Sequence, residues 1–401
     1  MKICFFMSTF LPKIGGAELA AHYLAEDLTR EGHRVTVLAP FYRGKRKIKT
    51  NYVIHRFKYP PGWLFFEPIL LLYLALEKLI SRFDLLHVYA TYPSGYCGSI
   101  LKKFFRFPLI ITPQGADIQK IPEIGYGLRL DPRVEKKIGL ALKRADAIVS
   151  ISDSIKRDIV EVGGDPKKIY DIPNGVWVDR FAHPQKDIRR IFHLNSTDRV
   201  ILAVGRNHPK KGYADLIEAM ALVKRKFRKA KCVIIGAGTE NLLPMVKDLD
   251  LQGEVVLAGE IAPAKGESLD LRALALPQED LVSAYLSSDI FVSPSLIEGF
   301  ALVIPEALAA GLPVVATDVP GNRDAIVDGY NGLIARARDP QDLAEKILVL
   351  LEDEDLRMRM SANARKSSLR YDWGKITEEY IKVYEHLLAK VWCRSRCAPY
   401  H

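Results

Sequence analysis

The chain has few cysteines and no long uninterrupted hydrophobic run. Its 401 residues include five cysteines, of which only Cys393 and Cys397 are close together. No second cysteine pair or histidine pair completes a zinc site, so the composition indicates a reduced, cytoplasmic protein. The most apolar stretch, residues 63–76, is interrupted by Glu67 and Pro68, and what remains is under half a membrane span. A spanning helix and a disulfide scaffold are therefore not expected.

The C-terminal half has no excess charge of either sign. The net charge of +10 comes entirely from residues 1–180, which hold 28 Lys and Arg against 18 Asp and Glu. The densest basic run is residues 43–49, Arg-Gly-Lys-Arg-Lys-Ile-Lys. It is either a solvated loop or a segment attracted to an anionic surface, such as phospholipid or a phosphorylated acceptor. Nucleic acid is not an expected partner, because no nucleic-acid-binding motif accompanies the charge.

Two alternatives remain open for residues 63–76. One is a buried core helix. The other is a helix or loop in the bilayer interface, with Trp63, Phe65 and Phe66 as anchors close to the basic run. A signal peptide is not expected, because residues 1–6 begin a strand and their apolar run is too short. The protein is thus expected in the cytoplasm, either free or peripheral on the inner face of a membrane.

The length and the pattern of apolar runs predict two α/β domains. A chain of 401 residues is too long for one ordinary core. Short β-rich runs alternate with helical patterns in both halves, which is typical of doubly wound parallel sheets. The expected strands are residues 3–7, 34–39, 52–57, 85–89, 109–112 and 147–152 in the first half, and 200–204, 232–236, 255–258, 290–293 and 313–317 in the second. Residues 173–184 join the halves.

The most informative feature is a pair of glutamates, Glu298 and Glu306, around a glycine loop. An apolar strand precedes the loop, and a short helical run and a second strand follow it. Backbone N–H groups from Gly299 to Val303 would face an anion such as a phosphate. Carboxylates on either side suit sugar hydroxyls, which donate hydrogen bonds. The pattern therefore fits a nucleotide-sugar, and the alternative is a solvated helix start with two exposed acids.

Residues 294–316, PSLIEGFALVIPEALAAGLPVVA, resemble the donor-site signature of glycosyltransferase family 4. Five further motifs stand in that family's order: Gly15-Gly16-Ala17-Glu18, Pro173-Asn174-Gly175-Val176, Gly205-Arg206 with Lys211-Gly212, Gly236-Ala237-Gly238, and Asn331-Gly332-Leu333. The resemblance covers about residues 1–390. A single glycine motif is weak, whereas six in order are strong.

The resemblance implies the GT-B fold, in which two Rossmann-like doubly wound domains face each other across a cleft. It implies an acceptor-binding domain over residues 1–180 and a nucleotide-sugar-binding domain over 181–370. A helix at 371–390 would cross back to the first domain, and residues 391–401 would form a tail. The family's chemistry implies retention of anomeric configuration without a metal or other cofactor, by a front-face mechanism.

The resemblance also assigns roles to residues of the second domain. Glu298 should bond the donor sugar, and Glu306 the ribose. Arg206 and Lys211 should neutralise the departing diphosphate, since cations there stabilise developing charge; their plainer interpretation is two surface cations. The backbone of Gly299, Phe300, Ala301 and Leu302 should hold the diphosphate.

Three features of the first domain and the insertion complete the expected site. Gly15 and Gly16 should let the backbone approach the donor, unless they form only a tight turn. Gln114 stands where the family often has a histidine, so orientation is expected there but not proton transfer. Asp117 either bonds a hydroxyl or caps a turn. An insertion at residues 262–276 lies where the nucleobase should bind, so the base is not predicted.

These features predict a retaining glycosyltransferase. Its partners would be a nucleotide-sugar donor and a hydroxyl acceptor, which is a lipid, a glycan or a polysaccharide intermediate. One alternative is a sugar-nucleotide epimerase of GT-B fold, which needs no acceptor. Another, from a different class, is a non-catalytic sugar-nucleotide-binding protein.

Overall fold

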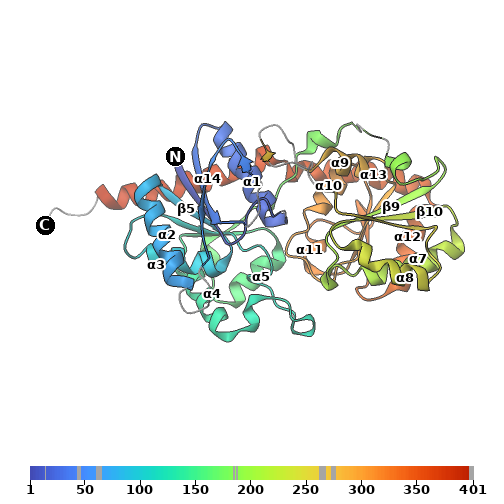
Figure 1. The fold of residues 1–401 in the computed structure, drawn as a ribbon, viewed down its shortest axis with the longest axis horizontal. Helices are drawn as coiled ribbons and strands as arrows, with labels where there is room; N and C mark the ends of the chain where they lie inside the picture. The colour runs from blue at the N-terminus through green and yellow to red at the C-terminus, as the bar shows by residue number, and fades with distance from the viewer. Residues whose placement is uncertain are drawn as a thin grey trace. The chain divides into compact units, whose positions relative to one another are not determined.

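The computed structural model describes residues 1–13, 15–42, 47–59, 66–183, 186, 188–261, 268–271 and 277–396. The chain divides into two compact units (Figure 1). Unit 1 comprises Met1–Asn174, Gly266–Arg272 and Trp373–His401, and unit 2 comprises Gly175–Lys265 and Ala273–Asp372.

Unit 1 contains a parallel seven-stranded sheet in the order β4-β2-β1-β5-β6-β7-β8. Most of its strands are short and almost wholly buried, as expected when helices cover both faces of a parallel sheet. The strands are β1 (Lys2–Met7), β2 (Arg34–Pro40), β4 (Val53–Phe57), β5 (Leu85–Tyr89), β6 (Leu109–Ile111), β7 (Ala147–Ser150) and β8 (Ile169–Asp171).

The helices of unit 1 begin at identifiable capping residues in several places. Asp131 accepts a hydrogen bond from the Arg133 amide at the start of α4, and Ser152 accepts one from the Ile155 amide at the start of α5. The helices are α1 (Gly16–Arg30), α2 (Phe66–Ser81), α3 (Tyr96–Leu101), α4 (Pro132–Arg144), α5 (Asp153–Glu161) and α14 (Trp373–Arg396).

The last helix, α14, packs beside α1 (Figure 1). The buried Tyr384 hydroxyl and the Nδ1 atom of His87, on strand β5, lie 2.8 Å apart. The other ring nitrogen of His87 lies 2.7 Å from the Thr112 hydroxyl, and burial lowers the pKa of His87 to about 3. A neutral imidazole thus joins α14 to the middle of the sheet through paired polar groups.

Unit 2 contains a parallel six-stranded sheet in the order β11-β10-β9-β13-β14-β15. Its strands are β9 (Arg199–Val204), β10 (Ala230–Ile235), β11 (Val255–Gly259), β13 (Ile290–Ser293), β14 (Val314–Thr317) and β15 (Gly332–Ala335). Its helices are α6 (Ile188–Ile191), α7 (Tyr213–Lys226), α8 (Leu243–Asp248), α9 (Glu279–Leu286), α10 (Val303–Ala309), α11 (Pro320–Arg323), α12 (Pro340–Glu352) and α13 (Glu354–Ser368).

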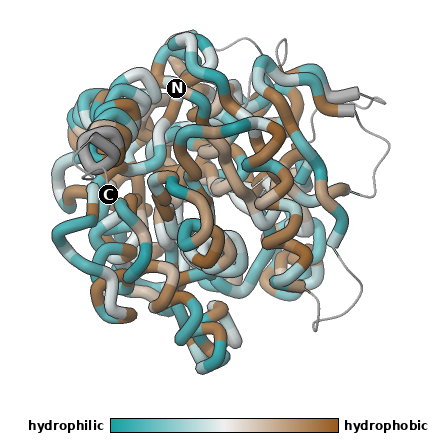
Figure 2. Tube along the Cα trace, turned by 90° about the vertical axis from the view of Figure 1, so that its left-hand side faces the viewer, coloured by the Kyte–Doolittle hydropathy of each residue, from teal (hydrophilic) through white to brown (hydrophobic). Residues whose placement is uncertain are grey.

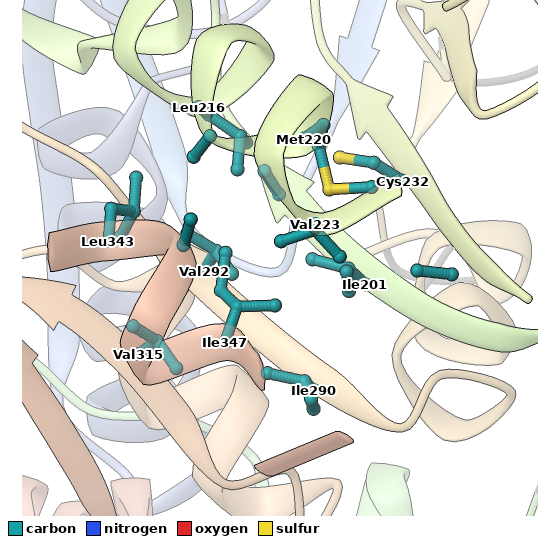
Figure 3. Packing of buried hydrophobic residues seen from close by; sticks show 14 of the residues in the cluster. Ile201, Leu216, Met220, Val223, Cys232, Ile290, Val292, Val315, Leu343 and Ile347 are labelled. Carbon is teal, nitrogen blue, oxygen red and sulfur yellow. The ribbon is translucent and has the colours of Figure 1, made fainter. Parts of the chain in front are cut away.

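Helices α7 and α12 pack together over one face of this second sheet. Figure 3 shows how Leu216 and Met220 of α7 and Ile347 of α12 approach the buried strand residues Ile201 and Val292. Figure 2 shows hydrophobic and hydrophilic residues interspersed along most helices, as expected for helices with one buried face.

A separate two-stranded parallel sheet pairs β3 (Lys47–Lys49) with β12 (Ser268–Asp270). Strand β12 lies within the insertion predicted at residues 262–276. The insertion therefore contributes one strand to unit 1, and its remaining residues, apart from Leu271, lie outside the described part of the chain.

The predicted fold class is confirmed, since both halves form doubly wound parallel sheets. The predicted boundary between the two domains was residue 180, whereas the first segment of unit 1 ends at Asn174. Helix α14 runs from Trp373 to Arg396, past the end predicted at residue 390. Residues 43–46 of the basic run and the expected anchors Trp63 and Phe65 lie outside the described residues.

Candidate active site

Two loops of unit 2 meet at the carboxyl ends of neighbouring strands. Strand β9 leads into residues 205–212, and strand β13, its partner in the sheet, leads into residues 294–302. The Leu296 amide donates to the Lys210 carbonyl at 2.7 Å. A Cβ atom on Gly212 would lie 2.0 Å from the Pro294 carbonyl oxygen, so only glycine allows this approach. The carboxyl edge of the sheet is where ligands bind in such folds.

Glu298 is buried between cations at this edge. Its side chain is only 5% exposed; one oxygen lies 2.6 Å from Lys211 Nζ and the other 3.3 Å from Lys210 Nζ. The Ser295 hydroxyl donates to the same carboxylate at 2.9 Å. Burial alone would raise the pKa of Glu298, but the charges of Lys211 and Lys210, with hydrogen bonds from Lys211 and Ser295, lower it to about 2. Glu298 is therefore ionised at neutral pH.

Neighbouring glycines hold the backbone close around this carboxylate. A Cβ atom on Gly321 would lie 2.3 Å from the Glu298 carbonyl oxygen, and one on Gly236 would lie 1.9 Å from the Gly205 carbonyl oxygen. Gly236 also has a φ of +151°, which side chains rarely adopt. These contacts hold the loop after β13 against α11, and the loop after β9 against the turn after β10, without intervening side chains.

A run of free amides follows Glu298. Helix α10 begins at Val303, and the structure gives the amides of residues 299–303 no acceptor among the described residues. Gly299, Phe300, Ala301 and Leu302, the predicted diphosphate-binding residues, thus lie directly after the buried carboxylate and before a helix N-terminus. Free N–H groups in such a run suit an anion.

Glu306 occupies a different environment from Glu298. It is buried in α10 and accepts a hydrogen bond of 2.8 Å from the Tyr285 hydroxyl. Burial raises the pKa of Glu306 to about 7, although the Tyr285 hydrogen bond and the charge of Arg180 act in the opposite direction. The two glutamates are therefore not the exposed acids of the plainer sequence interpretation, because both side chains are buried.

The loop after β9 concentrates positive charge. Arg206 is exposed, and the His208 ring accepts a hydrogen bond from the Lys210 amide at 3.2 Å. Partial burial and the charges of Lys210, Arg206 and Lys211 lower the pKa of His208. Lys210 and Lys211 both form ion pairs with the Glu298 carboxylate. The sequence assigned no role to Lys210, and only its position next to Lys211 could have indicated one.

The predicted residues of unit 1 lie at turns of that unit. Gly15 directly precedes α1, where a Cβ atom would meet the Glu18 carboxylate at 2.5 Å, and Gly16 is the first residue of the helix. Buried Glu18 accepts a hydrogen bond from the Thr9 hydroxyl. The Nε2 atom of Gln114 is buried and has no partner among the described residues.

Asp117 caps a backbone turn, one of the two roles that the sequence left open. Its carboxylate accepts hydrogen bonds from the amides of Thr91 at 2.7 Å, Gln114 at 2.8 Å and Gly115 at 3.0 Å. Burial raises its pKa, and these hydrogen bonds partly oppose the rise. Asp117 thus holds the turn that carries Gln114.

Within the described ranges, no three His, Cys, Asp or Glu side chains gather in a way that would hold a metal ion. Among the same residues, no helix has both the length and the apolar character needed to cross a bilayer.

Two doubly wound units, one with a basic, glycine-lined strand edge, fit the GT-B fold of glycosyltransferases. Comparison with known families agrees with this assignment. Residues 14–180 match the model of Glycosyltransferase Family 4, and residues 198–353 match the model of Glycosyl transferases group 1. The chain belongs to this family and is a glycosyltransferase.

Several known proteins are similar over nearly the whole chain. The phosphatidyl-myo-inositol mannosyltransferase of Mycolicibacterium smegmatis is 29% identical over 92% of this chain and 90% of its own. Sucrose-phosphate synthase from Thermosynechococcus elongatus has the same fold, with a TM-score of 0.80, 20% identity, and coverage of 97% of this chain and 100% of its own. Anabaena HepE in complex with UDP-glucose gives a TM-score of 0.75, 21% identity, and coverage of 96% and 100%.

Proposed function

We propose that the protein is a retaining, metal-independent glycosyltransferase that moves a sugar from a nucleotide-sugar to an acceptor hydroxyl. The observation that carries this proposal is the buried Glu298, held by Lys210 and Lys211 directly before five backbone amides that have no acceptor among the described residues. A fixed carboxylate suits sugar hydroxyls, and the amides and cations suit a diphosphate. The solved structure of HepE with UDP-glucose supports a donor of this chemical class.

In the proposed complex, different residues of unit 2 bind different parts of the donor. Glu298 accepts hydrogen bonds from the sugar, and Glu306 accepts them from the ribose. Arg206 and Lys211 neutralise the diphosphate, and the amides from Gly299 to Leu302 hold its oxygens. Side-chain cations thus supply the charge stabilisation that a metal ion gives in other enzymes.

The proposed reaction takes place on one face of the sugar. The bond between the anomeric carbon and the diphosphate oxygen breaks while the acceptor oxygen bonds to the same carbon from the same side. The acceptor proton passes to the departing diphosphate oxygen, so configuration is retained and no protein nucleophile is needed. The protein contributes positioning and electrostatic stabilisation.

Unit 1 is proposed to hold the acceptor and to complete donor binding. The buried Nε2 atom of Gln114 is a hydrogen-bond donor without a partner among the described residues, which suits a sugar oxygen. Gly15 and Gly16, which have no side chain, are proposed to let the start of α1 approach the donor closely. A glutamine holds no charge there, so its proposed role is orientation.

We further propose a lipid-linked acceptor at an anionic membrane surface. The similar mannosyltransferase is named for phosphatidyl-myo-inositol, and the excess positive charge of this chain lies within residues 1–180. Cations near a membrane gain about 1 kcal/mol each from anionic lipid. The protein would then be cytoplasmic and peripheral on the inner face of the membrane.

The test combines donor binding with product analysis. UDP-, GDP- and ADP-sugars are screened by thermal shift, because a ligand at 100 times its Kd stabilises the fold by about 2.7 kcal/mol. The stabilising donor is then incubated with candidate acceptors, and the anomeric configuration of the product is determined by NMR. We expect an α-linked product from an α-linked donor. An inverted product would contradict retention.

The same assay separates the alternatives. A new nucleotide-sugar formed without any acceptor would indicate an epimerase. Binding without turnover across lipid, glycan and polysaccharide acceptors would indicate a non-catalytic sugar-nucleotide-binding protein. Turnover that persists in EDTA supports metal independence, and turnover lost in EDTA and restored by a divalent cation contradicts it.

A further inference from the structure

Helix α2 has an outer face that is wholly apolar. The residues that α2 buries are Leu70, Leu74 and Glu77, and the His55 ring nitrogen lies 2.6 Å from the Glu77 carboxylate. The residues that it exposes are Pro68, Leu72, Leu76, Leu79 and Ile80. A surface helix ordinarily puts charged and polar residues on its outer face. No charged side chain is exposed between Phe66 and Ser81.

The exposure of this face is large. The exposed fractions are 58% for Leu72, 45% for Leu76, 62% for Leu79 and 70% for Ile80. Their spacing of four, three and one residues places them on one side of the helix. Helix α3 packs against α2 (Figure 1), and Phe104, which follows α3, is 77% exposed. Exposed apolar side chains gathered on one helix face in this way mark an interaction site.

Exposed cations follow both elements. Arg82 is exposed directly after α2, and Lys103 and Arg106 are exposed on either side of Phe104. The exposed acid closest in sequence to α2 is Asp84, and its carboxylate already accepts a hydrogen bond from the Lys2 amide. The apolar face is thus accompanied by positive charge, and the whole of residues 1–180 carries the same sign.

We propose that the outer face of α2, together with Phe104, inserts into the interfacial layer of an anionic lipid bilayer. This inference rests on the membrane-bound acceptor of the proposed function and names the surface that would carry the attachment. A helix of 16 residues is about 24 Å long, too short to span a bilayer, but it can lie in the plane of the interface. Leu72, Leu76, Leu79 and Ile80 would enter the acyl boundary, while Arg82, Lys103 and Arg106 would meet anionic headgroups.

Charge disfavours a second copy of the chain as the occupant of this face. In a symmetric dimer the same patch meets itself, so the three cations would be brought towards their own copies. An anionic bilayer matches both the aliphatic side chains and the charge next to them.

The test is flotation of the full chain with vesicles of phosphatidylcholine, with and without phosphatidylglycerol. The test variant is Leu76→Gln with Ile80→Gln, since glutamine keeps helix propensity and both positions are exposed. A matched control is Met358→Gln, which changes a side chain that is 62% exposed on α13. A charge variant is Lys103→Gln with Arg106→Gln.

We expect the wild type and Met358→Gln to float with the anionic vesicles. The double α2 variant should lose at least about tenfold in bound fraction, because two large aliphatic side chains no longer enter the lipid. The charge variant should bind less to anionic vesicles and keep its residual binding to neutral ones. Unchanged thermal midpoints would show that the variants remain folded.

Three results would overturn the inference. If the α2 variant floats as well as the wild type, the protein still attaches to membranes, but α2 does not carry the attachment. A wild-type dimer that sedimentation shows becoming a monomer in the α2 variant would make this face a self-association surface. If the wild type itself fails to float, the membrane part of the proposed function fails too, whereas donor binding and transfer are measured separately.

Discussion

At the scale of single residues, Glu298 is the side chain on which the proposed chemistry depends most. We expect Glu298→Gln to reduce transfer on the order of 100-fold, because a positioned charged group is lost. The measurement is the initial rate of product formation with the donor at saturation. Since glutamine preserves the shape of the side chain, thermal unfolding should show that the fold survives. Transfer within threefold of the wild type would remove Glu298 from the reaction.

The cations after β9 lead to a separate prediction about binding. Arg206→Ala and Lys211→Ala should each weaken nucleoside diphosphate binding by roughly 1.5–3 kcal/mol, the range for hydrogen bonds to charged groups. Calorimetry with the diphosphate that matches the preferred donor measures this. Lys224→Ala is the control, because that lysine pairs with Asp250 and Glu254. Unchanged affinity in both site variants would remove these cations from the diphosphate site.

Glu306 makes stability depend on pH in a defined direction. Its pKa is raised from 4.5 to about 7 by burial, so the folded protein binds more protons than the unfolded chain between these values. Below pH 4.5 both states are protonated and Glu306 costs nothing; between pH 4.5 and 7 the unfolded chain ionises first, so the folded state loses stability progressively, and the loss is complete above pH 7. Glu306→Gln should therefore become more stable relative to the wild type, by on the order of 1–3 kcal/mol, between pH 4.5 and 8.

Urea unfolding of both proteins across this pH range provides the measurement. A stability difference that stays constant with pH would mean that Glu306 does not titrate in this window.

At the scale of secondary structure elements, α14 is held to unit 1 by a buried polar contact. We expect Tyr384→Phe to lower the free energy of unfolding by about 1–3 kcal/mol, because Nδ1 of His87 loses its buried partner. The midpoint of urea unfolding reports the change. Tyr330→Phe is a suitable control, since Tyr330 is 38% exposed. Equal midpoints for the two variants would contradict this account of how α14 docks.

The elements that the sequence predicted correctly are those with strong local patterns. Apolar runs of four or more residues identified β1, β9 and β13, because strands of a parallel sheet are buried on both faces. Strands β8 and β15 were missed: β8 has only three residues, none of them buried, and only two of the four residues of β15 are buried. The pairing of β12 with β3 joins segments far apart in sequence, so no local pattern could indicate it.

In the candidate site too, features with a local sequence pattern could be predicted, and contacts between distant segments could not. The sequence could indicate that Glu298, Lys211 and the glycine loop lie together, because each follows a strand and β9 and β13 are neighbours in the sheet. The ion pair between Lys210 and Glu298 was missed, because it depends on how two loops meet. The contact of Glu306 with Tyr285 was missed for the same reason, as it joins α10 to a residue of α9.

At the scale of the whole molecule, uneven charge predicts salt-sensitive membrane attachment. Replacing Arg43, Lys45, Arg46, Lys47 and Lys49 by glutamine should reduce flotation with anionic vesicles at low salt, since each cation near lipid contributes about 1 kcal/mol. Raising the salt concentration should have a similar effect on the wild type. Unchanged flotation of this variant would show that these cations do not contribute to membrane attachment.

The close backbone approaches at the strand ends also limit how this enzyme can diversify. A methyl group at Gly212, Gly236 or Gly321 has no room, because a carbonyl oxygen of another loop occupies its place. Random libraries aimed at a new donor would therefore produce mostly misfolded clones at these three positions. Gly238, by contrast, would bring a Cβ atom no closer than 3.6 Å to its neighbours, although its φ of +78° favours glycine or asparagine. Changes in donor preference are then more accessible through side chains around the diphosphate loop than through the loop's own glycines.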